Sequence, residues 1–157
     1  MGDRLLTNCG IGGSDERIQI VISDGRIARI GGSGMLATER TLDLNGATVV
    51  AGYIDVHNHG AVGVDVNTAT ADELLNVGAF LAKNGVTAWM PTLVPDSDET
   101  YRRAIAAIDE VMERQTGLAV AEVVGVHYEG VFASEKMCGA LRPEFFRSGR
   151  WSLTGGQ

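Results

Sequence analysis

Two of the three histidines in the sequence, His57 and His59, stand close together after an apolar run that predicts a strand. In an extended chain, side chains two positions apart share a face, so both imidazoles should project to one side. Two neutral imidazoles on one face make half a metal site. A histidine near apolar residues is more often a hydrogen-bonded structural residue, so the spacing by itself leaves both interpretations open.

A second apolar run, residues 123–126, ends in side chains of the same kind. It leads into His127 and Glu129, and Gly130 follows. Metal and active sites gather where parallel strands open into loops, so we expect both strand ends to contribute to one site. If this strand is regular, His127 shares the face of Glu129 and could line the pocket or orient a ligand. A buried, hydrogen-bonded histidine is the alternative.

These two segments resemble known motifs. Residues 52–60, Gly-Tyr-Ile-Asp-Val-His-Asn-His-Gly, resemble the Pro-Gly-aromatic-Ile-Asp-x-His-x-His-Gly signature of the amidohydrolase superfamily. Residues 125–132, Gly-Val-His-Tyr-Glu-Gly-Val-Phe, resemble the Gly-x-His-x-Glu-Gly-Pro-Phe segment of N-acetylglucosamine-6-phosphate deacetylases. The first motif indicates the superfamily, and the second is far more specific within it.

The resemblance implies metal-dependent amide hydrolysis. His57, His59 and Glu129 would bind one or two divalent ions, and Glu129 could bridge two. Zinc suits this ligand set, with iron or manganese as alternatives. The substrate would be N-acetylglucosamine 6-phosphate or a related N-acetyl amino sugar phosphate, which is split into amino sugar phosphate and acetate. Asp55 would share the face of the histidines but is not a ligand in the family, so we interpret it as a supporting carboxylate.

No catalytic residue is expected within the chain. A general acid must protonate the departing amine, and in the family this role belongs to an aspartate that would fall beyond Gln157. Two further histidine ligands would also lie there. The resemblance therefore covers essentially the whole chain but only the first part of such an enzyme, so we expect these 157 residues to be inactive alone.

The resemblance also indicates residues that could contact the sugar. The family has a Gly-x-His-x-Pro-like segment, and residues 139–143, Gly-Ala-Leu-Arg-Pro, match it here. Ala140, Leu141, Arg142 and the earlier His127 are the candidates. Leu141 stands where the family has a histidine and cannot hydrogen-bond a hydroxyl group, whereas Arg142 could. This departure leaves the identity of the sugar open.

Alternation and glycine turns predict short strands in residues 1–50. Polar and apolar side chains alternate in 17–22 and again in 26–30, with a hairpin turn at 23–25 between them, which predicts a small antiparallel sheet. The resemblance implies that residues 1–50 are a portion of a small β-sandwich. It implies that residues 51–157 begin a metal-dependent (β/α)8 barrel.

After Gly60 the sequence predicts helices alternating with strands. A capping box at 70–73 begins a helix that ends at Gly85, and the strand 86–90 follows. Acidic residues at 96–99 begin a second helix, which ends before a strand at 121–128. The first helix has its apolar stripe at Leu74, Val77 and Phe80 or Leu81, and the second at Tyr101, Ile105, Ile108 and Met112. Strands and helices in this order predict a parallel α/β unit.

Length sets a limit on this fold. A (β/α)8 barrel takes about 250 residues, and three strands cannot close a barrel of eight. We therefore expect the chain to be the first three βα units of a longer enzyme, for which the resemblance suggests a homodimer.

Composition and charge restrict the partners. The net charge of −7 and the pI near 4.9 provide no basic stripe for nucleic acid. The N-terminus has no long apolar core, so neither a signal peptide nor a membrane span is expected. Cys9 and Cys138 are too far apart for a zinc knuckle and too few for a disulfide framework, which favours reduced thiols in the cytoplasm.

Two alternatives to the deacetylase remain. One is another amidohydrolase, acting on a cyclic amide or an N-acyl amino acid, which the segment 127–132 disfavours. The other is a non-catalytic metal-binding or interaction module that pairs through an exposed strand edge. Turnover of an acetylated substrate would exclude the second alternative.

Overall fold

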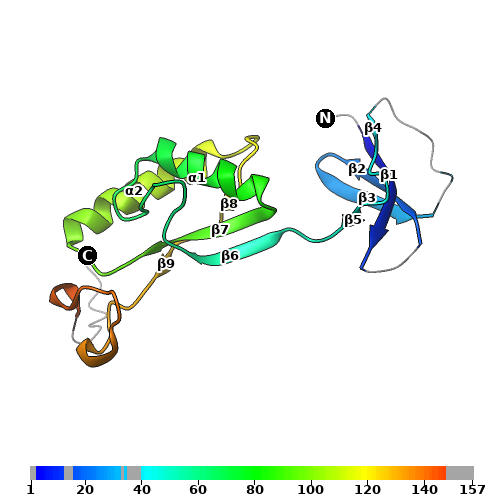
Figure 1. The fold of residues 1–157 in the computed structure, drawn as a ribbon. Coiled ribbons are helices and arrows are strands. Elements are labelled where there is room, and N and C mark those ends of the chain that lie inside the picture. Colours follow the sequence, from blue (N-terminus) through cyan, green and yellow to red (C-terminus); the bar gives the residue numbers. More distant parts are fainter. Residues whose placement is uncertain (1–2, 13–15, 33, 35–39, 148–157) are drawn as a thin grey trace, which may run out of the picture. The chain divides into compact units, whose positions relative to one another are not determined.

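The computed structural model describes residues 3–12, 16–32, 34 and 40–147, which form a mixed α/β fold. The chain folds as two compact units, Met1–Ala51 and Gly52–Gln157, and each unit has its own sheet (Figure 1). The glycines at 31–34 also predict a flexible turn, and Ser33 of this segment lies outside the described residues. Within the described ranges, none of the helices combines the length and apolar character needed to cross a bilayer.

The first unit is a mixed five-stranded sheet. Its strands are β1 (Arg4–Ile11), β2 (Ile18–Ser23), β3 (Arg26–Gly31), β4 (Thr41–Asp43) and β5 (Thr48–Val49). β1 pairs with β2 and β2 with β3 in antiparallel fashion, as predicted, and Asp24 and Gly25 form the turn with positive φ angles of 49° and 75°. The sheet as a whole is mixed, because the chain crosses to the other edge of β1, where β4 and β5 pair in parallel.

The second unit is a parallel sheet with helices between its strands. Its elements are β6 (Tyr53–Asn58), α1 (Ala71–Lys83), β7 (Val86–Leu93), α2 (Asp98–Arg114), β8 (Glu122–Val123), β9 (His127–Tyr128) and the 3-10 turns η1 (Glu135–Met137) and η2 (Pro143–Phe145). β7 is central, with β6 on one side and β8 and β9 on the other, all parallel. The described strands do not close into a barrel.

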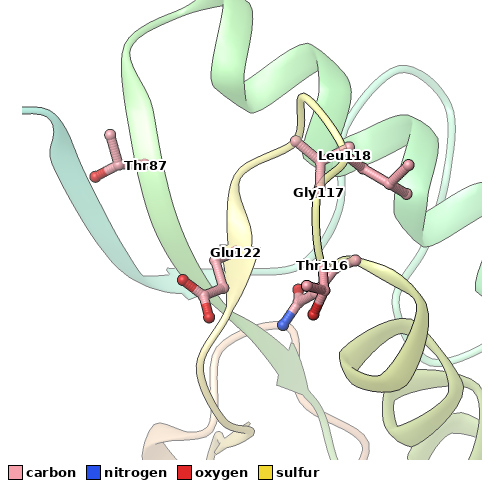
Figure 2. Close-up of a pocket in the computed structure, with 7 residues that line it drawn as sticks. Thr87, Thr116, Gly117, Leu118 and Glu122 are labelled. Carbon is pink, nitrogen blue, oxygen red and sulfur yellow. The ribbon is translucent and has the colours of Figure 1, made fainter. Parts of the chain in front are cut away.

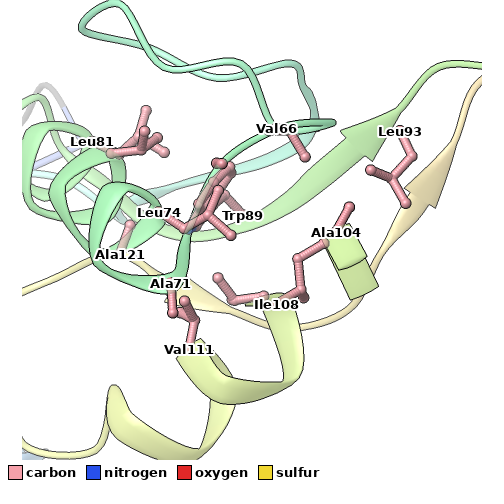
Figure 3. Close-up of a cluster of buried hydrophobic side chains, with 13 residues drawn as sticks. Val66, Ala71, Leu74, Leu81, Trp89, Leu93, Ala104, Ile108, Val111 and Ala121 are labelled. Carbon is pink, nitrogen blue, oxygen red and sulfur yellow. The ribbon is translucent and has the colours of Figure 1, made fainter. Parts of the chain in front are cut away.

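Both helices begin at side-chain caps. Thr70 and Glu73 form the predicted capping box, and Ser97 caps α2 by accepting a hydrogen bond from the Thr100 amide. α1 and α2 pack on one face of the sheet around Trp89, whose side chain is fully buried (Figure 3). The other members of this core are Val66, Ala69, Ala71, Leu74, Val77, Leu81, Leu93, Ala104, Ile108, Val111, Ala121 and Val123.

The apolar stripe of α2 is rotated from the predicted one. Its buried residues are Ala104, Ile108 and Val111, whereas Met112 is 41% exposed. Met112 follows Val111 by one position and so points about 100° further round the helix. Tyr101 and Ile105, also predicted for this face, are partly buried against the core.

The predicted strand at 121–128 is broken into β8 and β9. Val123 pairs with Trp89 and His127 with Thr92, so four steps along this segment match three steps along β7, and one residue is extra. Such a bulge reverses the alternation of side chains. Beside the break, Gln115 binds the Val123 backbone twice, accepting from its amide at 2.7 Å and donating to its carbonyl at 3.0 Å.

Candidate metal centre

The three predicted metal ligands converge at the carboxyl ends of β6 and β9. The Nε2 atoms of His57 and His59 are 3.0 Å apart, and the Glu129 Oε2 atom lies 3.4 Å from the first and 3.0 Å from the second. Their side chains are 49%, 48% and 35% exposed, so small molecules can reach the group. Among the described residues, these are the side chains whose ligand atoms gather closely enough to hold an ion.

These spacings fit one divalent ion. Zinc binds imidazole nitrogen and carboxylate oxygen at about 2.0–2.2 Å with tetrahedral geometry, which separates neighbouring ligand atoms by roughly 3.3 Å. The three observed separations of 3.0, 3.0 and 3.4 Å match that value. Two neutral nitrogens and one carboxylate also form the donor set of many catalytic zinc sites, which keep a further position open.

Bulges on both sides of β7 direct the ligands to one face of the sheet. In β6, Asp55 pairs with Trp89 and Asn58 with Pro91, so three steps match two. Asn58 therefore shares the helix-covered face of Trp89, and the histidines on either side of Asn58 project from the opposite face. The extra residue before β9 moves His127 to this same opposite face, beside its partner Thr92.

Asp55 does not share the face of the histidines, contrary to the prediction. Its carboxylate accepts hydrogen bonds from the Asn58 side-chain amide at 2.8 Å and from the His57 backbone amide at 3.2 Å. Asn58 in turn accepts from the Gly60 amide at 2.8 Å. The bulge is the physical reason, because it places Asp55 and Asn58 together on the other face, where they brace the backbone of the histidine segment.

His127 lies beside the ligand group. Its ring centroid is 4.7 Å from that of His57, with the two rings tilted by 45°. Its Nδ1 atom is 3.2 Å from the hydroxyl oxygen of Thr92. Both interpretations of this histidine therefore have support, since the ring is partly buried and hydrogen-bonded and also adjoins the candidate metal centre.

Comparison with known proteins finds similar deacetylases. The chain is 36% identical over 129 residues to an N-acetylgalactosamine-6-phosphate deacetylase of Escherichia coli O157:H7, an overlap of 82% of the chain and 33% of the relative. It is 28% identical over 166 residues to an N-acetylglucosamine-6-phosphate deacetylase of Lysinibacillus sphaericus, with 98% and 41% covered. Over most of its length the chain matches the N-acetylglucosamine-6-phosphate deacetylases.

The fold agrees with that of these deacetylases. The crystal structure of N-acetylglucosamine-6-phosphate deacetylase from Pasteurella multocida superposes with a TM-score of 0.82 at 23% sequence identity, covering 95% of the chain and 40% of that structure. The chain thus spans about a third to two fifths of the length of the deacetylases it matches. No protein-family model matches it.

The residues that the deacetylase resemblance suggested for sugar contact lie in the segment after β9. Arg142 pairs with Asp96 and stacks its guanidinium 4.9 Å from the centre of the Phe145 ring. Leu141 packs so closely on Gly130 that a Cβ atom there would be 2.5 Å from the leucine Cδ1 atom. Ala140 is exposed. These contacts hold the segment in place, and sugar binding by these residues stays a prediction.

Thr92 is a residue that the sequence analysis missed. It is fully buried near the end of β7, accepts a hydrogen bond from the Asn58 amide at 2.9 Å and contacts His127. The available signal was a hydroxyl residue late in the otherwise apolar run that begins at Val86, which also contains Thr87 near its start. The strand predicted at 86–90 ends two residues too early to include it.

A hollow of about 320 Å³ lies at the opposite end of the sheet from the candidate metal centre (Figure 2). Thr87, near the start of β7, and Glu122, at the start of β8, flank it. The loop after α2 closes its far side through Thr116, Gly117 and Leu118. Because the ligand atoms gather at the carboxyl ends of the strands, this hollow is not part of the candidate centre.

Proposed function

We propose that the chain is the metal-binding portion of an amidohydrolase that deacetylates N-acetylglucosamine 6-phosphate or a related N-acetyl amino sugar phosphate. The convergence of His57, His59 and Glu129 at metal-binding distances carries this proposal. Its relatives support the substrate class, since they are deacetylases of both the glucosamine and the galactosamine compounds. The choice between these two sugars is left to experiment.

The finer architecture is part of the proposal. Residues 1–50 would belong to a small β-sandwich, and residues 51–157 would form the first three βα units of a (β/α)8 barrel. Two observations support the barrel units: the strands of the second unit are parallel, with α1 between β6 and β7 and α2 between β7 and β8, and the candidate ligands lie at the carboxyl ends of β6 and β9. A homodimer in the cytoplasm completes the proposal, and it includes neither a nucleic-acid nor a membrane partner.

In this proposal the residues of the chain bind the metal ion and orient the substrate amide beside it. His57, His59 and Glu129 would hold a divalent ion, for which zinc is the best suited, and the bound ion would supply polarisation of an amide carbonyl and activation of water near neutral pH. His57 and His59 would offer ring nitrogens to such an ion, and Glu129 would offer carboxylate oxygens, the second of which a second ion could use. Protonation of the departing amine is assigned to a residue outside this chain.

Metal binding is the first prediction of this proposal. Purified chain should bind Zn²⁺ or Co²⁺, and Glu129→Gln should weaken binding by more than the roughly 10- to 100-fold that loss of an outer hydrogen-bond partner causes. Glu122→Gln is the matched control. Glu122 lies on the same side of β7 as Glu129, but it is at the start of β8 and so at the opposite end of the sheet from the candidate centre. Competition with a chromogenic chelator measures the affinities, and equal binding by both variants would contradict the assignment of Glu129.

Turnover separates an enzyme portion from a non-catalytic metal-binding module. We expect no acetate release by the chain alone. Joined to the part of the Pasteurella multocida deacetylase that it does not cover, the chain should release acetate from either N-acetyl amino sugar 6-phosphate. The same fusion with His57→Ala and His59→Ala should not. A folded, metal-loaded fusion that is inactive on both sugars would favour the non-catalytic module.

A further inference from the structure

Thr92 is surrounded by three polar groups from three different positions. Its Oγ1 atom accepts a hydrogen bond from the Asn58 amide at 2.9 Å, lies 3.2 Å from His127 Nδ1 and is 3.4 Å from the Met90 carbonyl oxygen. The side chain has no exposed surface. Water therefore cannot replace any of these partners at the hydroxyl.

The capacity of a hydroxyl limits the directions that these hydrogen bonds can take. A threonine hydroxyl donates one hydrogen and has two acceptor lone pairs. The Asn58 amide can only donate, so it uses one lone pair, and the Met90 carbonyl oxygen can only accept. When the single hydroxyl hydrogen goes to Met90, the remaining lone pair faces His127 Nδ1, which then carries the ring proton. His127 Nε2, on the other side of the ring, is left as the basic nitrogen.

The same hydroxyl joins the two strand ends that carry the candidate ligands. Asn58, whose amide it binds, stands between His57 and His59 in the chain. His127, its other partner, begins β9, two residues before Glu129. One buried side chain of the central strand therefore fixes both segments relative to each other.

We propose that Thr92 is a positioning residue of the candidate metal centre, holding His127 with its proton on Nδ1 and fixing the histidine pair of β6 against the end of β9. This inference rests on the proposed function for the role of the centre. The state of His127 is a separate claim, which holds or fails without any metal.

The protonation of His127 is tested directly on the metal-free chain. Long-range proton–nitrogen NMR correlations distinguish the two neutral imidazole forms, and the spectra are recorded at about pH 9, above the ordinary range of histidine titration. We expect the Nδ1–H form for His127. The Nε2–H form in the wild-type chain would overturn the proposal, and this result does not depend on whether any variant folds.

Substitutions then test the link to metal binding. Thr92→Val keeps the shape of the side chain and removes the hydroxyl, so His127 should lose its single form and Co²⁺ affinity should fall roughly 10- to 100-fold. Thr92→Ser restores the hydroxyl and should restore both properties. Thr87→Val, an exposed position at the other end of β7, is the matched control and should leave both unchanged.

The outcomes separate this inference from the proposed function. A wild-type chain that shows the Nδ1–H form but binds no Co²⁺ contradicts the metal centre and retains the positioning of His127 by Thr92. If the wild-type chain binds Co²⁺, and Thr92→Val changes neither the His127 signals nor the Co²⁺ affinity, then only the positioning role of Thr92 is overturned. Rescue by Thr92→Ser separates loss of the hydroxyl from general damage to the fold.

Discussion

Gly60 ends the histidine segment in a conformation that other residues adopt with difficulty. Its φ angle is +122°, and a Cβ atom at this position would lie 2.0 Å from the Val64 carbonyl oxygen. Its amide binds Asn58, and the His59 carbonyl accepts from the Val66 amide at 3.0 Å, so the loop folds back tightly on the histidines. A side chain here must push the loop away.

We therefore expect Gly60→Ala to lower the free energy of unfolding by at least about 1–3 kcal/mol, the usual range for a strained backbone position. It should also weaken metal binding, because the loop beside His59 must move. Gly63→Ala is the control, since Gly63 also has a positive φ angle, +83°, but a Cβ atom there would meet none of the described residues within 4 Å. Urea denaturation and metal titration measure both effects. Equal losses in the two variants would show that the close contact with Val64 does not matter.

At the level of residues, the sequence predicted which side chains gather at the candidate centre better than it predicted the residues that support them. His57, His59 and Glu129 were identifiable because few residue types bind metals and strand ends collect them. Thr92 was not, because its importance comes from hydrogen bonds to neighbouring strands, and the cross-strand register that creates them cannot be read from one strand. Asp55 was placed on the wrong face for the same reason.

Among the elements, the helices were predicted well and the outer strands less well. Capping residues and apolar spacing are local signals, and they located α1 and α2. The two bulges that flank β7 depend on pairing between strands, so simple alternation missed them. These bulges turn the candidate ligands toward one face of the sheet. The strands that carry the bulges were therefore predicted least well, although they build the candidate centre.

The segment after β9 is attached to the start of α2 by two arginine–aspartate pairs, Arg142 with Asp96 and Arg147 with Asp98. Burial alone raises the pKa of Asp96, but hydrogen bonds from the Ser97 amide, Arg142 and Asn67 outweigh it. The pKa of Asp96 is therefore lowered in the folded chain. The stability it contributes is present above its unfolded pKa and is lost as the pH falls through the folded pKa.

Asp96→Asn should therefore loosen this segment at neutral pH, by about 1–2 kcal/mol for the lost charge-assisted hydrogen bonds. In the wild-type chain the same loosening should appear below about pH 4. Asp98→Asn is the control, because Asp98 is 58% exposed and exposed pairs contribute little. Hydrogen exchange of the Phe146 and Arg147 amides reports the attachment. Faster exchange in the Asp98 variant than in the Asp96 variant would contradict this ranking.

In the molecule as a whole, β6 leaves apolar side chains in contact with solvent. Ile54 and Val56 are 66% and 57% exposed, and β6 pairs only with β7 in the described sheet. Exposed apolar strands with a free edge promote association between chains. The net charge of −7 opposes this association but acts over the whole surface.

We expect the chain to associate at increasing concentration, and Ile54→Lys to reduce this association. Sedimentation velocity over a concentration series measures it. Ile27→Lys, at an exposed position on β3, adds the same charge to the other unit and should have a smaller effect. Equal effects of the two substitutions would show that charge, and not the surface of β6, controls association.

At the opposite edge of the sheet from β6, the side chain of Gln115 covers part of the outer edge of β8. Val124 donates its amide hydrogen to Trp89 on β7, so the amide and carbonyl of Val123 point outward, and Gln115 binds both of them. A primary amide thereby imitates one peptide unit of a neighbouring strand. Any incoming strand must first displace Gln115 at this point, and the amide hydrogen of Val123 is shielded from solvent exchange although it lies at an open border.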